Sequence, residues 1–498
     1  MADLAPAVVG IDLGTSAVKI LAVTAAGREL ASGSEFYGLQ TPHPDYVEQD
    51  ADVVYLATMR VLERVLADVR LRGNEVAAIG FSSAMHGVLC VDESGEPLSH
   101  VITWMDRRAH GIADGWRSDG TGEELYQATG APMHPMLPIA KLRWLAERDP
   151  QLFARSRRFV GLKELVVFRW TGEWLVDHGI ASATGMFDLR SRTWSERALE
   201  LAGVDPTKLS RPAPPSTALH SFRPAIAREL GLTDGTAVVL ASSDGALANI
   251  GVGSTTPGDV ALTLGTSGAV RVLSTEPVLD AKCRTFCYCA DDVRYVVGGP
   301  TSAAGASLDW VFALLLDDVR ATERFERAAM LAARVPAGAD GLVVLPFFAG
   351  ERAPYWNSNL RGAFDGLDLS HNRSTILRAA FESVVFGVYA VYAVMRELAG
   401  DAQTLLLSGG LTKAPLVRRL LADVFGVPAT QPYQQEASAF AAALLAAQSV
   451  GLVRDPAETA RAAGCDEPTL PNAALGATYA EAFAKYRRFV DAHLTLSE

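Results

Sequence analysis

The stretch Val8-Val-Gly-Ile-Asp-Leu-Gly-Thr-Ser-Ala-Val-Lys-Ile-Leu-Ala-Val23 decides the fold of this chain. Residues 8–11 and 18–23 are rich in β-branched side chains, and a polar Gly-Thr-Ser turn separates them. Two such runs around a tight turn are typical of a β-hairpin. The turn is polar and small where an ordinary hairpin needs only to reverse direction, so it is a candidate ligand site.

The turn can bind an anion, and its residue types suggest a phosphate with a metal ion. Gly14 lets the backbone bend so that N–H groups face the anion. The hydroxyls of Thr15 and Ser16 and the ammonium of Lys19 can add donors. Asp12 closes the first strand, where a carboxylate beside a phosphate favours an intervening Mg²⁺ ion. The alternatives are a plain hairpin with a polar turn and, for Lys19, a solvated strand residue.

The same pattern returns later in the chain. Residues 259–264 and 269–273 again flank a turn, Gly265-Thr-Ser-Gly268. A repeat at a separation near 250 residues predicts two similarly built halves that face one another. The glycine-rich residues 251–258 are the expected boundary, which divides the chain into domains 1–253 and 254–498.

Composition narrows the class of protein. The 498 residues carry a net charge of −12 and are 49% hydrophobic, which predicts a compact soluble protein with a large core and argues against a nucleic-acid surface. The sequence shows no signal-peptide pattern, and its longest uncharged stretch, 437–453, is too short to span a bilayer. We therefore expect a cytoplasmic protein with no membrane or nucleic-acid partner. The five cysteines are too few for a disulfide framework. Three of them cluster, and the alternation of residues around them predicts a strand rather than a metal site: Cys283, Cys287 and Cys289.

Periodicity and turn residues predict the remaining elements. A third strand is expected before residue 40, and Asp50 or Asp52 should cap a long helix that runs to about Arg72. The segment 109–230 has a helical and loop-like pattern. Further strands are expected at 76–82, 236–241, 341–346 and 404–407, and further helices at 305–316, 321–333, 374–398, 414–425 and 437–449.

The doubled hairpin and the turn Ser408-Gly-Gly410 before a helix resemble the superfamily of sugar kinases, Hsp70 and actin ATPases. This resemblance implies an α/β fold of two actin-like (ribonuclease H-like) ATPase domains with an interdomain cleft that binds ATP. It places Gly14, Thr15, Ser16 and Lys19 on one side of the phosphates and Gly265 and Thr266 on the other. It also places Gly409 and Gly410 against adenosine and Gly305 along the nucleotide cleft. A plain helix-entry turn is the alternative for Gly409 and Gly410.

Two longer segments resemble the signatures of the FGGY carbohydrate kinases. Met136-Leu-Pro-Ile-Ala-Lys-Leu-Arg-Trp-Leu145 resembles the first signature, with Pro138, Lys141 and Trp144 in register. Gly362-Ala-Phe-Asp-Gly-Leu367 through Glu382 resembles the second and departs from it at Thr375. Membership implies transfer of phosphate from Mg-ATP to a hydroxyl of a small polyol or sugar acid. Asp12 is then the residue that organises Mg²⁺.

Within this family, several segments look most like bacterial gluconokinases. They include Met85-His86, Ile102-Thr-Trp104 and Gly350-Glu-Arg-Ala-Pro-Tyr-Trp-Asn357. This resemblance implies conversion of D-gluconate to 6-phospho-D-gluconate. Xylulose kinase and glycerol kinase are the alternatives, because they share parts of these motifs. Phe440-Ala441 departs from the family pattern, which implies altered helix packing.

The resemblance also assigns the chemistry. Asp244, in a Ser-Asp-Gly turn, is the expected general base for the accepting hydroxyl, and capping of a helix that begins near residue 246 is the alternative. The expected substrate-binding residues are Met85, His86, Trp104, Asp106 and Asp244. The sequence leaves open which cation holds the gluconate carboxylate; the candidates are Arg107, Arg108 and His134.

A different class of function is an Hsp70-like or actin-like nucleotide switch. That class predicts a further peptide-binding domain or polymer contacts, whereas only about fifty residues follow the last core helix. The substrate set around His86 and Trp104 has no use in such a switch. The oligomeric state is open, with a homodimer included.

Overall fold

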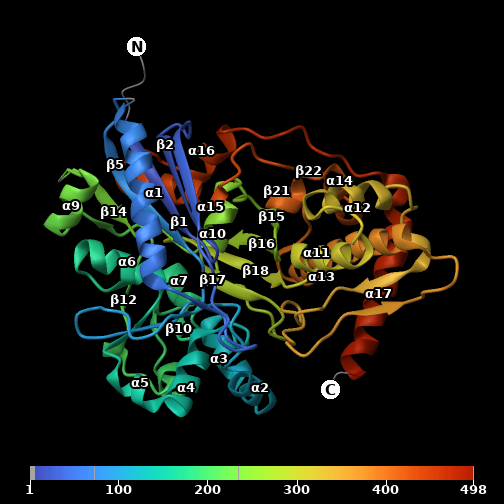
Figure 1. The fold of residues 1–498 in the computed structure, drawn as a ribbon, viewed down its shortest axis with the longest axis horizontal. Coiled ribbons are helices and arrows are strands. Elements are labelled where there is room, and N and C mark those ends of the chain that lie inside the picture. The colour runs from blue at the N-terminus through green and yellow to red at the C-terminus, as the bar shows by residue number, and fades with distance from the viewer. Residues whose placement is uncertain (1–5, 72, 234, 497–498) are drawn as a thin grey trace.

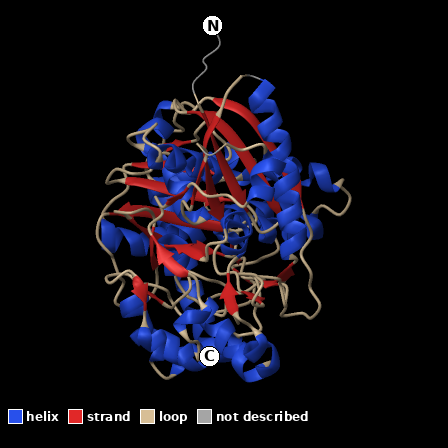
Figure 2. Cartoon of the chain, turned by 90° about the vertical axis from the view of Figure 1, so that its left-hand side faces the viewer, coloured by secondary structure: helices blue, strands red, loops and turns tan. Residues whose placement is uncertain are grey.

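The computed structural model describes residues 6–71, 73–233 and 235–496, which form two β-sheet units side by side (Figure 1). The helices pack on the faces of both sheets, and the strands of the first sheet run through the upper half of the turned view in Figure 2. Each sheet contains one of the two hairpins, so both predicted hairpins are confirmed.

The first sheet has six strands in the order β13-β14-β5-β1-β2-β3. The hairpin β1-β2 is antiparallel, while β1 pairs with β5, and β5 with β14, in parallel. Parallel strands end at one edge of a sheet, and in open α/β sheets ligands bind at that edge. The strands are β1 (Ala7–Leu13), β2 (Ala17–Thr24), β3 (Glu29–Phe36), β5 (Val76–Ser83), β13 (Ala218–Leu219) and β14 (Ala237–Val239).

The second sheet repeats this arrangement in the order β17-β18-β16-β15-β21-β22. Its hairpin β15-β16 is antiparallel, and β15 pairs with β21, and β21 with β22, in parallel. Five strands therefore match in order and direction between the sheets, which confirms the predicted duplication. The strands are β15 (Asp259–Leu264), β16 (Gly268–Ser274), β17 (Phe286–Cys289), β18 (Tyr295–Thr301), β21 (Thr404–Ser408) and β22 (Ala429–Thr430).

The chain returns to the first sheet near its end. Helix α15 (Ala437–Ser449) packs against β1, β5 and α10 (Asp244–Gly251). A Cβ atom on Gly10 would lie 1.8 Å from the carbonyl oxygen of Ala439, and one on Gly80 would lie 2.2 Å from that of Ala442. Only glycine allows this approach of helix to sheet. Phe440, one of the two residues that depart from the family pattern, is fully buried and lies against Gly27.

The long helices have the predicted positions. Helix α1 (Ala51–Leu71) is capped by Asp50, whose Oδ1 accepts from the N–H groups of residues 52 and 53; its predicted end at residue 72 lies outside the described residues. Helix α13 (Arg373–Ala399) is long and apolar enough to cross a membrane, but 83% of its apolar window is buried inside the protein. It is therefore a core helix. The other helices around the second sheet are α11 (Gly305–Leu315), α12 (Arg324–Ala332), α14 (Pro415–Phe425) and α17 (Gly476–Leu496), while α16 (Pro456–Ala462) packs against α15 and α10.

The prediction for residues 109–230 was incomplete, because short strands break the helical pattern there. Strand β8 (Arg158–Val160) pairs with β6 (Leu89–Val91), and β12 (Arg211–Ala213) pairs with β9 (Leu175–Asp177). Strands this short carry too few residues to show an alternating pattern. Two-stranded pairs also join β10 (Phe187–Asp188) to β11 (Thr193–Trp194), β4 (Glu48–Gln49) to β7 (Val101–Ile102), and β19 (Val343–Leu345) to β20 (Ala363–Asp365).

The helices of this segment are α2 (His110–Ser118), α3 (Thr121–Thr129), α4 (Pro138–Arg148), α5 (Pro150–Arg155), α6 (Leu162–Thr171), α7 (His178–Ser182), α8 (Glu196–Ala202) and α9 (Pro224–Leu230). Most of them build the lower part of the molecule in Figure 1, and α9 lies above the others beside β14. The helix predicted at 321–333 begins instead as a 3₁₀ turn, Ala321–Glu323, before α12. The cysteine cluster lies on and beside strand β17, as predicted.

Candidate functional site

A cavity of about 220 Å³ lies between the two halves, and we call it the interdomain cavity. Both sheets contribute to its wall because the two hairpin turns and the start of α10 meet there. The first half supplies Thr15, Met85, His86, Trp104, Met136 and Asp244. The second half supplies Thr263, Ser267, Gly268, Ala269, Arg271, Phe286, Tyr288, Pro300 and Arg352. Four of the five predicted substrate residues therefore share one cavity.

Asp244 is the first residue of α10, and a short segment, residues 240–243, connects it to β14. Its Oδ1 accepts from the N–H of the next residue, Gly245, at 2.6 Å, and Ser243 occupies the N-cap position. Asp244 thus does not cap the helix, and its second carboxylate oxygen is left for another partner. Burial raises the pKa of Asp244, and the nearby Arg271 guanidinium lowers it.

Asp12 lies near Asp244, at the end of β1. Its neighbours in the sheet are Lys19 on β2 and Ser82 on β5, and the Ser82 hydroxyl donates to Asp12 Oδ1 at 2.6 Å. Burial and then the charge of Asp244 raise the pKa of Asp12 to about 6. Two carboxylates that repel each other beside a polar turn form a favourable place for a cation.

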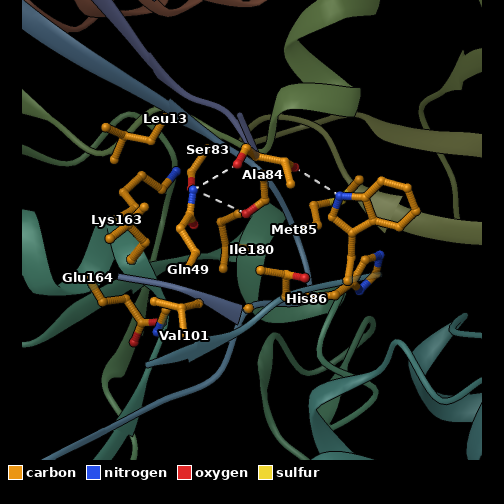
Figure 3. A pocket seen from close by; sticks show the side chains of 16 residues that line it. Leu13, Gln49, Ser83, Ala84, Met85, His86, Val101, Lys163, Glu164 and Ile180 are labelled. Atoms are coloured by element: carbon orange, nitrogen blue, oxygen red, sulfur yellow. Dashed lines mark hydrogen bonds between the residues drawn. The ribbon is translucent and has the colours of Figure 1, made fainter. Parts of the chain in front are cut away.

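The first turn is held in shape by its neighbours. The carbonyl oxygen of Gly14 accepts from the Tyr37 hydroxyl at 2.7 Å, and the Gln49 amide donates to the carbonyl of Thr15 at 3.0 Å. Figure 3 shows Gln49, Met85 and His86 around a smaller cavity of about 30 Å³. Ser16 is exposed at the tip, and Lys19 pairs with Glu436 at 2.7 Å. A phosphate that recruits Lys19 must therefore compete with Glu436.

Two glycines, Gly305 and Gly409, pack closely against the second turn. The N–H of Gly305 donates to the carbonyl oxygen of Gly265 at 3.0 Å, and the N–H of residue 306 donates to that of Thr266. A Cβ atom on Gly305 would lie 2.5 Å from the Gly265 carbonyl oxygen. Gly409 has a φ of 93°, and a Cβ atom there would lie 2.3 Å from the carbonyl oxygen of residue 264. Gly410, which follows, has open space beside it. The predicted nucleotide residues of the second half are thus neighbours.

His86 is neutral across the physiological pH range. Its Nδ1 lies 2.7 Å from the carbonyl oxygen of Ala183, so Nδ1 carries the proton and Nε2 can accept a hydrogen bond. Burial and then the charge of Lys141 lower the pKa of His86 to about 3. The residue also has a φ of 68°, which is rare for a side chain larger than glycine and typical of functional loops.

Trp104 links the first turn to the second half. Its indole N–H donates to the Thr15 hydroxyl at 2.9 Å, and the Arg352 guanidinium lies over its ring at 4.7 Å. An indole face can cover the apolar side of a sugar. The position of Trp104 is therefore fixed from both sides of the cavity.

Comparison with known protein families shows which family this chain belongs to. The model of the FGGY family of carbohydrate kinases matches residues 7–251 with its N-terminal domain and residues 260–450 with its C-terminal domain. The chain belongs to the FGGY family of carbohydrate kinases. It is an ATP-dependent kinase of a small carbohydrate substrate, with the two-domain actin-like ATPase fold. The family settles the choice between a kinase and a nucleotide switch.

Relatives in this FGGY family carry different substrate names. Gluconokinase of Bacillus subtilis (strain 168) is 34% identical over 456 residues, 89% of this chain and 88% of the relative. Xylulose kinase of Staphylococcus epidermidis is 30% identical over 450 residues, 89% of this chain and 88% of the relative. The crystal structure of gluconate kinase from Lactobacillus acidophilus has a TM-score of 0.92 at 31% identity and covers 98% of both chains.

Asp106 differs from the other predicted substrate residues of this FGGY kinase. Its Oδ2 accepts from the N–H of Val47 at 2.8 Å, and Arg108 binds both of its carboxylate oxygens. Arg108 also pairs with Glu48, so neither Asp106 nor Arg108 is left without a protein partner. Asp106 lies instead beside a second cavity of about 190 Å³, together with Arg107 and His134.

Sequence reasoning missed four cationic residues of this FGGY kinase. Arg271 and Arg352 reach the interdomain cavity from the second half, while the buried Lys141 and Lys163 bind backbone carbonyls beneath it. Arg271 had a signal, because it alternates with Ala269 on the strand after the second turn. Lys141 and Arg352 stood in quoted motifs, but only the fold shows what they contact.

Proposed function

We propose that this FGGY kinase is a gluconokinase that transfers the terminal phosphate of ATP to the O6 hydroxyl of D-gluconate. The observation that carries the proposal is that Asp244, His86 and Trp104 line one cavity together with residues that follow the second hairpin turn. The higher identity to the gluconokinase of Bacillus subtilis than to the xylulose kinase of Staphylococcus epidermidis supports gluconate.

In this proposal the first half binds the sugar acid. Asp244 accepts the proton of the O6 hydroxyl, and its free carboxylate oxygen gives it the capacity to do so. Nε2 of His86 accepts from a second hydroxyl, the Trp104 ring covers the carbon chain, and Met85 contributes apolar contact. Fixed positions of acceptor and base supply much of the rate enhancement of phosphoryl transfer.

The two turns hold ATP in this proposal. Gly14, Thr15, Ser16 and Lys19 contact the phosphates from one side, and Gly265, Thr266 and Gly305 from the other. Gly409 and Gly410 allow close approach of the adenosine. Their neighbouring positions in the structure support these roles.

Mg²⁺ fits the residues at Asp12. The donor is a hard carboxylate oxygen. Burial and then the charge of Asp244 raise the pKa of Asp12, and a divalent ion would stabilise the charged carboxylate. We propose that Asp12 holds this ion through its water shell and that the ion neutralises charge on the phosphates. We also propose domains 1–253 and 254–498, a cytoplasmic location and either a monomer or a homodimer.

An ADP-release assay with Mg-ATP tests the substrate. The panel contains D-gluconate, D-xylulose, glycerol, ribulose and erythritol at equal concentrations. We expect kcat/KM for gluconate to exceed every other value at least about tenfold. A preference for xylulose would support the alternative named by the Staphylococcus epidermidis relative, and a preference for glycerol would equally contradict the proposal.

A further inference from the structure

Two arginines from the second half bring positive charge into the interdomain cavity. Arg271 extends from β16, and Arg352 from the loop before α13. The first half faces them with one carboxylate, Asp244, and with a neutral His86. Two guanidinium groups beside the catalytic base can bind an anion there, either a carboxylate of the substrate or a phosphate.

Arg271 has unused hydrogen-bonding capacity. Its Nη1 donates to the Thr263 hydroxyl at 3.2 Å, whereas its Nε is buried and has no hydrogen-bond partner among the described residues. An unpaired buried donor costs free energy, so such donors are normally satisfied by a ligand or by water. The Arg271 guanidinium lines the cavity, and a guanidinium can bind a carboxylate through a pair of its N–H groups.

Arg352 is held in position by neutral acceptors, and the neighbouring Glu351 charge also acts on it. Its Nη2 donates to the carbonyl of Thr301 at 2.9 Å and its Nε to the Ser302 hydroxyl at 3.3 Å. The adjacent carboxylate of Glu351 accepts from the Thr301 hydroxyl and from the N–H groups of Ser302 and Arg352. Nη1 of Arg352 is thus left for a ligand, and the Trp104 ring underneath fixes its plane.

We propose that Arg271 and Arg352 form the receptor for the carboxylate of the substrate, which makes this enzyme a kinase of sugar acids. The inference rests on the proposed function and deepens it. Because Arg271 lies close to Asp244, a six-carbon sugar acid must bind in a bent conformation for its accepting hydroxyl to reach Asp244 and its carboxylate to reach the guanidinium groups. Asp244 binds the hydroxyl end, and the two guanidinium groups bind the acid end. Arg107, Arg108 and His134 then have other roles.

The test compares D-gluconate with D-gluconamide, a neutral substrate of nearly the same shape. The wild type is expected to prefer gluconate by about a hundredfold in kcat/KM, because the receptor is left unpaired by the amide. In Arg271→Met and Arg352→Met, the preference should fall to about threefold or less through a higher KM for gluconate. Turnover of gluconamide should fall less than turnover of gluconate, although Arg271 also acts on Asp244 and Arg352 on Trp104. Arg271→Lys and Arg352→Lys should restore part of the preference.

Arg294→Met is the matched control, because Arg294 lies in the turn before β18 and pairs with Asp291 away from the cavity. It should keep the full preference. If the two arginines instead bind ATP phosphates, their variants will lose gluconate and gluconamide turnover equally, and their KM for ATP will rise. That result would overturn the proposed carboxylate receptor. A preference unchanged in both Met variants also overturns it. A wild type that phosphorylates xylulose but not gluconate would overturn the proposed function itself.

Discussion

The buried ammonium of Lys141 donates a hydrogen bond to the backbone carbonyl oxygen of His86 at 2.7 Å. The same Nζ atom donates to the carbonyl of Thr103 at 2.7 Å and to that of Ile102 at 3.3 Å. One side chain on α4 therefore joins the loop of His86 to the segment that leads into Trp104. Burial lowers the pKa of Lys141 to about 7, which shows the electrostatic cost of this arrangement.

Lys141→Met should raise KM for the sugar about tenfold or more with a smaller change in kcat, because both sugar-binding loops lose their common anchor. Steady-state kinetics at saturating ATP measure both constants. KM for ATP is the internal control, because Lys141 makes no direct hydrogen bond to either of the two hairpin turns among the described residues. A purely structural role would lower the amount of active enzyme without separating the two KM values.

Lys163 is the counterpart of Lys141 beneath the catalytic base. Its Nζ donates to the carbonyls of Leu240 at 3.1 Å and Ser242 at 2.9 Å and pairs with Asp177 at 2.5 Å. Lys163→Met should therefore lower kcat about tenfold or more, with little change in KM for the sugar. Because this variant buries an unpaired carboxylate, the double variant Lys163→Met/Asp177→Asn should regain thermal stability while kcat stays low.

Asp244→Asn should lose at least about a hundredfold in kcat, because an amide cannot accept the proton of the attacking hydroxyl. Calorimetric titration with ADP should give an affinity close to that of the wild type. Near-normal turnover in this variant would contradict the role of Asp244 as base.

Activity should decline as the pH falls through about 6. The pKa of Asp12 is raised to about 6, so its carboxylate is charged above that pH and becomes protonated below it, when its capacity to hold Mg²⁺ is lost. Asp12→Asn should be inactive at every pH. Its melting temperature should exceed that of the wild type at pH 8 by about 1–3 °C. The difference should shrink as the pH falls below about 6 and vanish only below about 3.8, where Asp12 is protonated in both the folded and the unfolded protein.

Gly305→Ala should raise KM for ATP about tenfold, since the new methyl group would lie 2.5 Å from the carbonyl oxygen of Gly265 and displace the second turn. KM for the sugar should change less. Gly111→Ala is the matched control, because Gly111 lies in α2 with open space around it. An unchanged KM for ATP in Gly305→Ala would remove this residue from the nucleotide site.

Local signals made the two hairpins predictable, and their repetition was enough to predict the paired sheets. The partners of Asp106 were not predictable, because Val47 lies 59 residues away in sequence and contacts Asp106 only after folding. Arg271 and Arg352 were missed for the same reason. The sequence around Arg271 does not show that folding will bring Asp244 of the other half beside it. Long-range packing, rather than local pattern, assembles the cationic part of the site.

The position of α15 limits how this molecule can be divided. Its residues belong to the last fifth of the chain, yet its backbone lies directly on Gly10 and Gly80 of the first sheet. A fragment that ends at residue 253 would expose that sheet face to water, without the helix that the glycines accommodate. One face of the first sheet is therefore covered only after residue 449 has been synthesised. For this reason the amino-terminal half is not an independent module during translation or in a truncated protein.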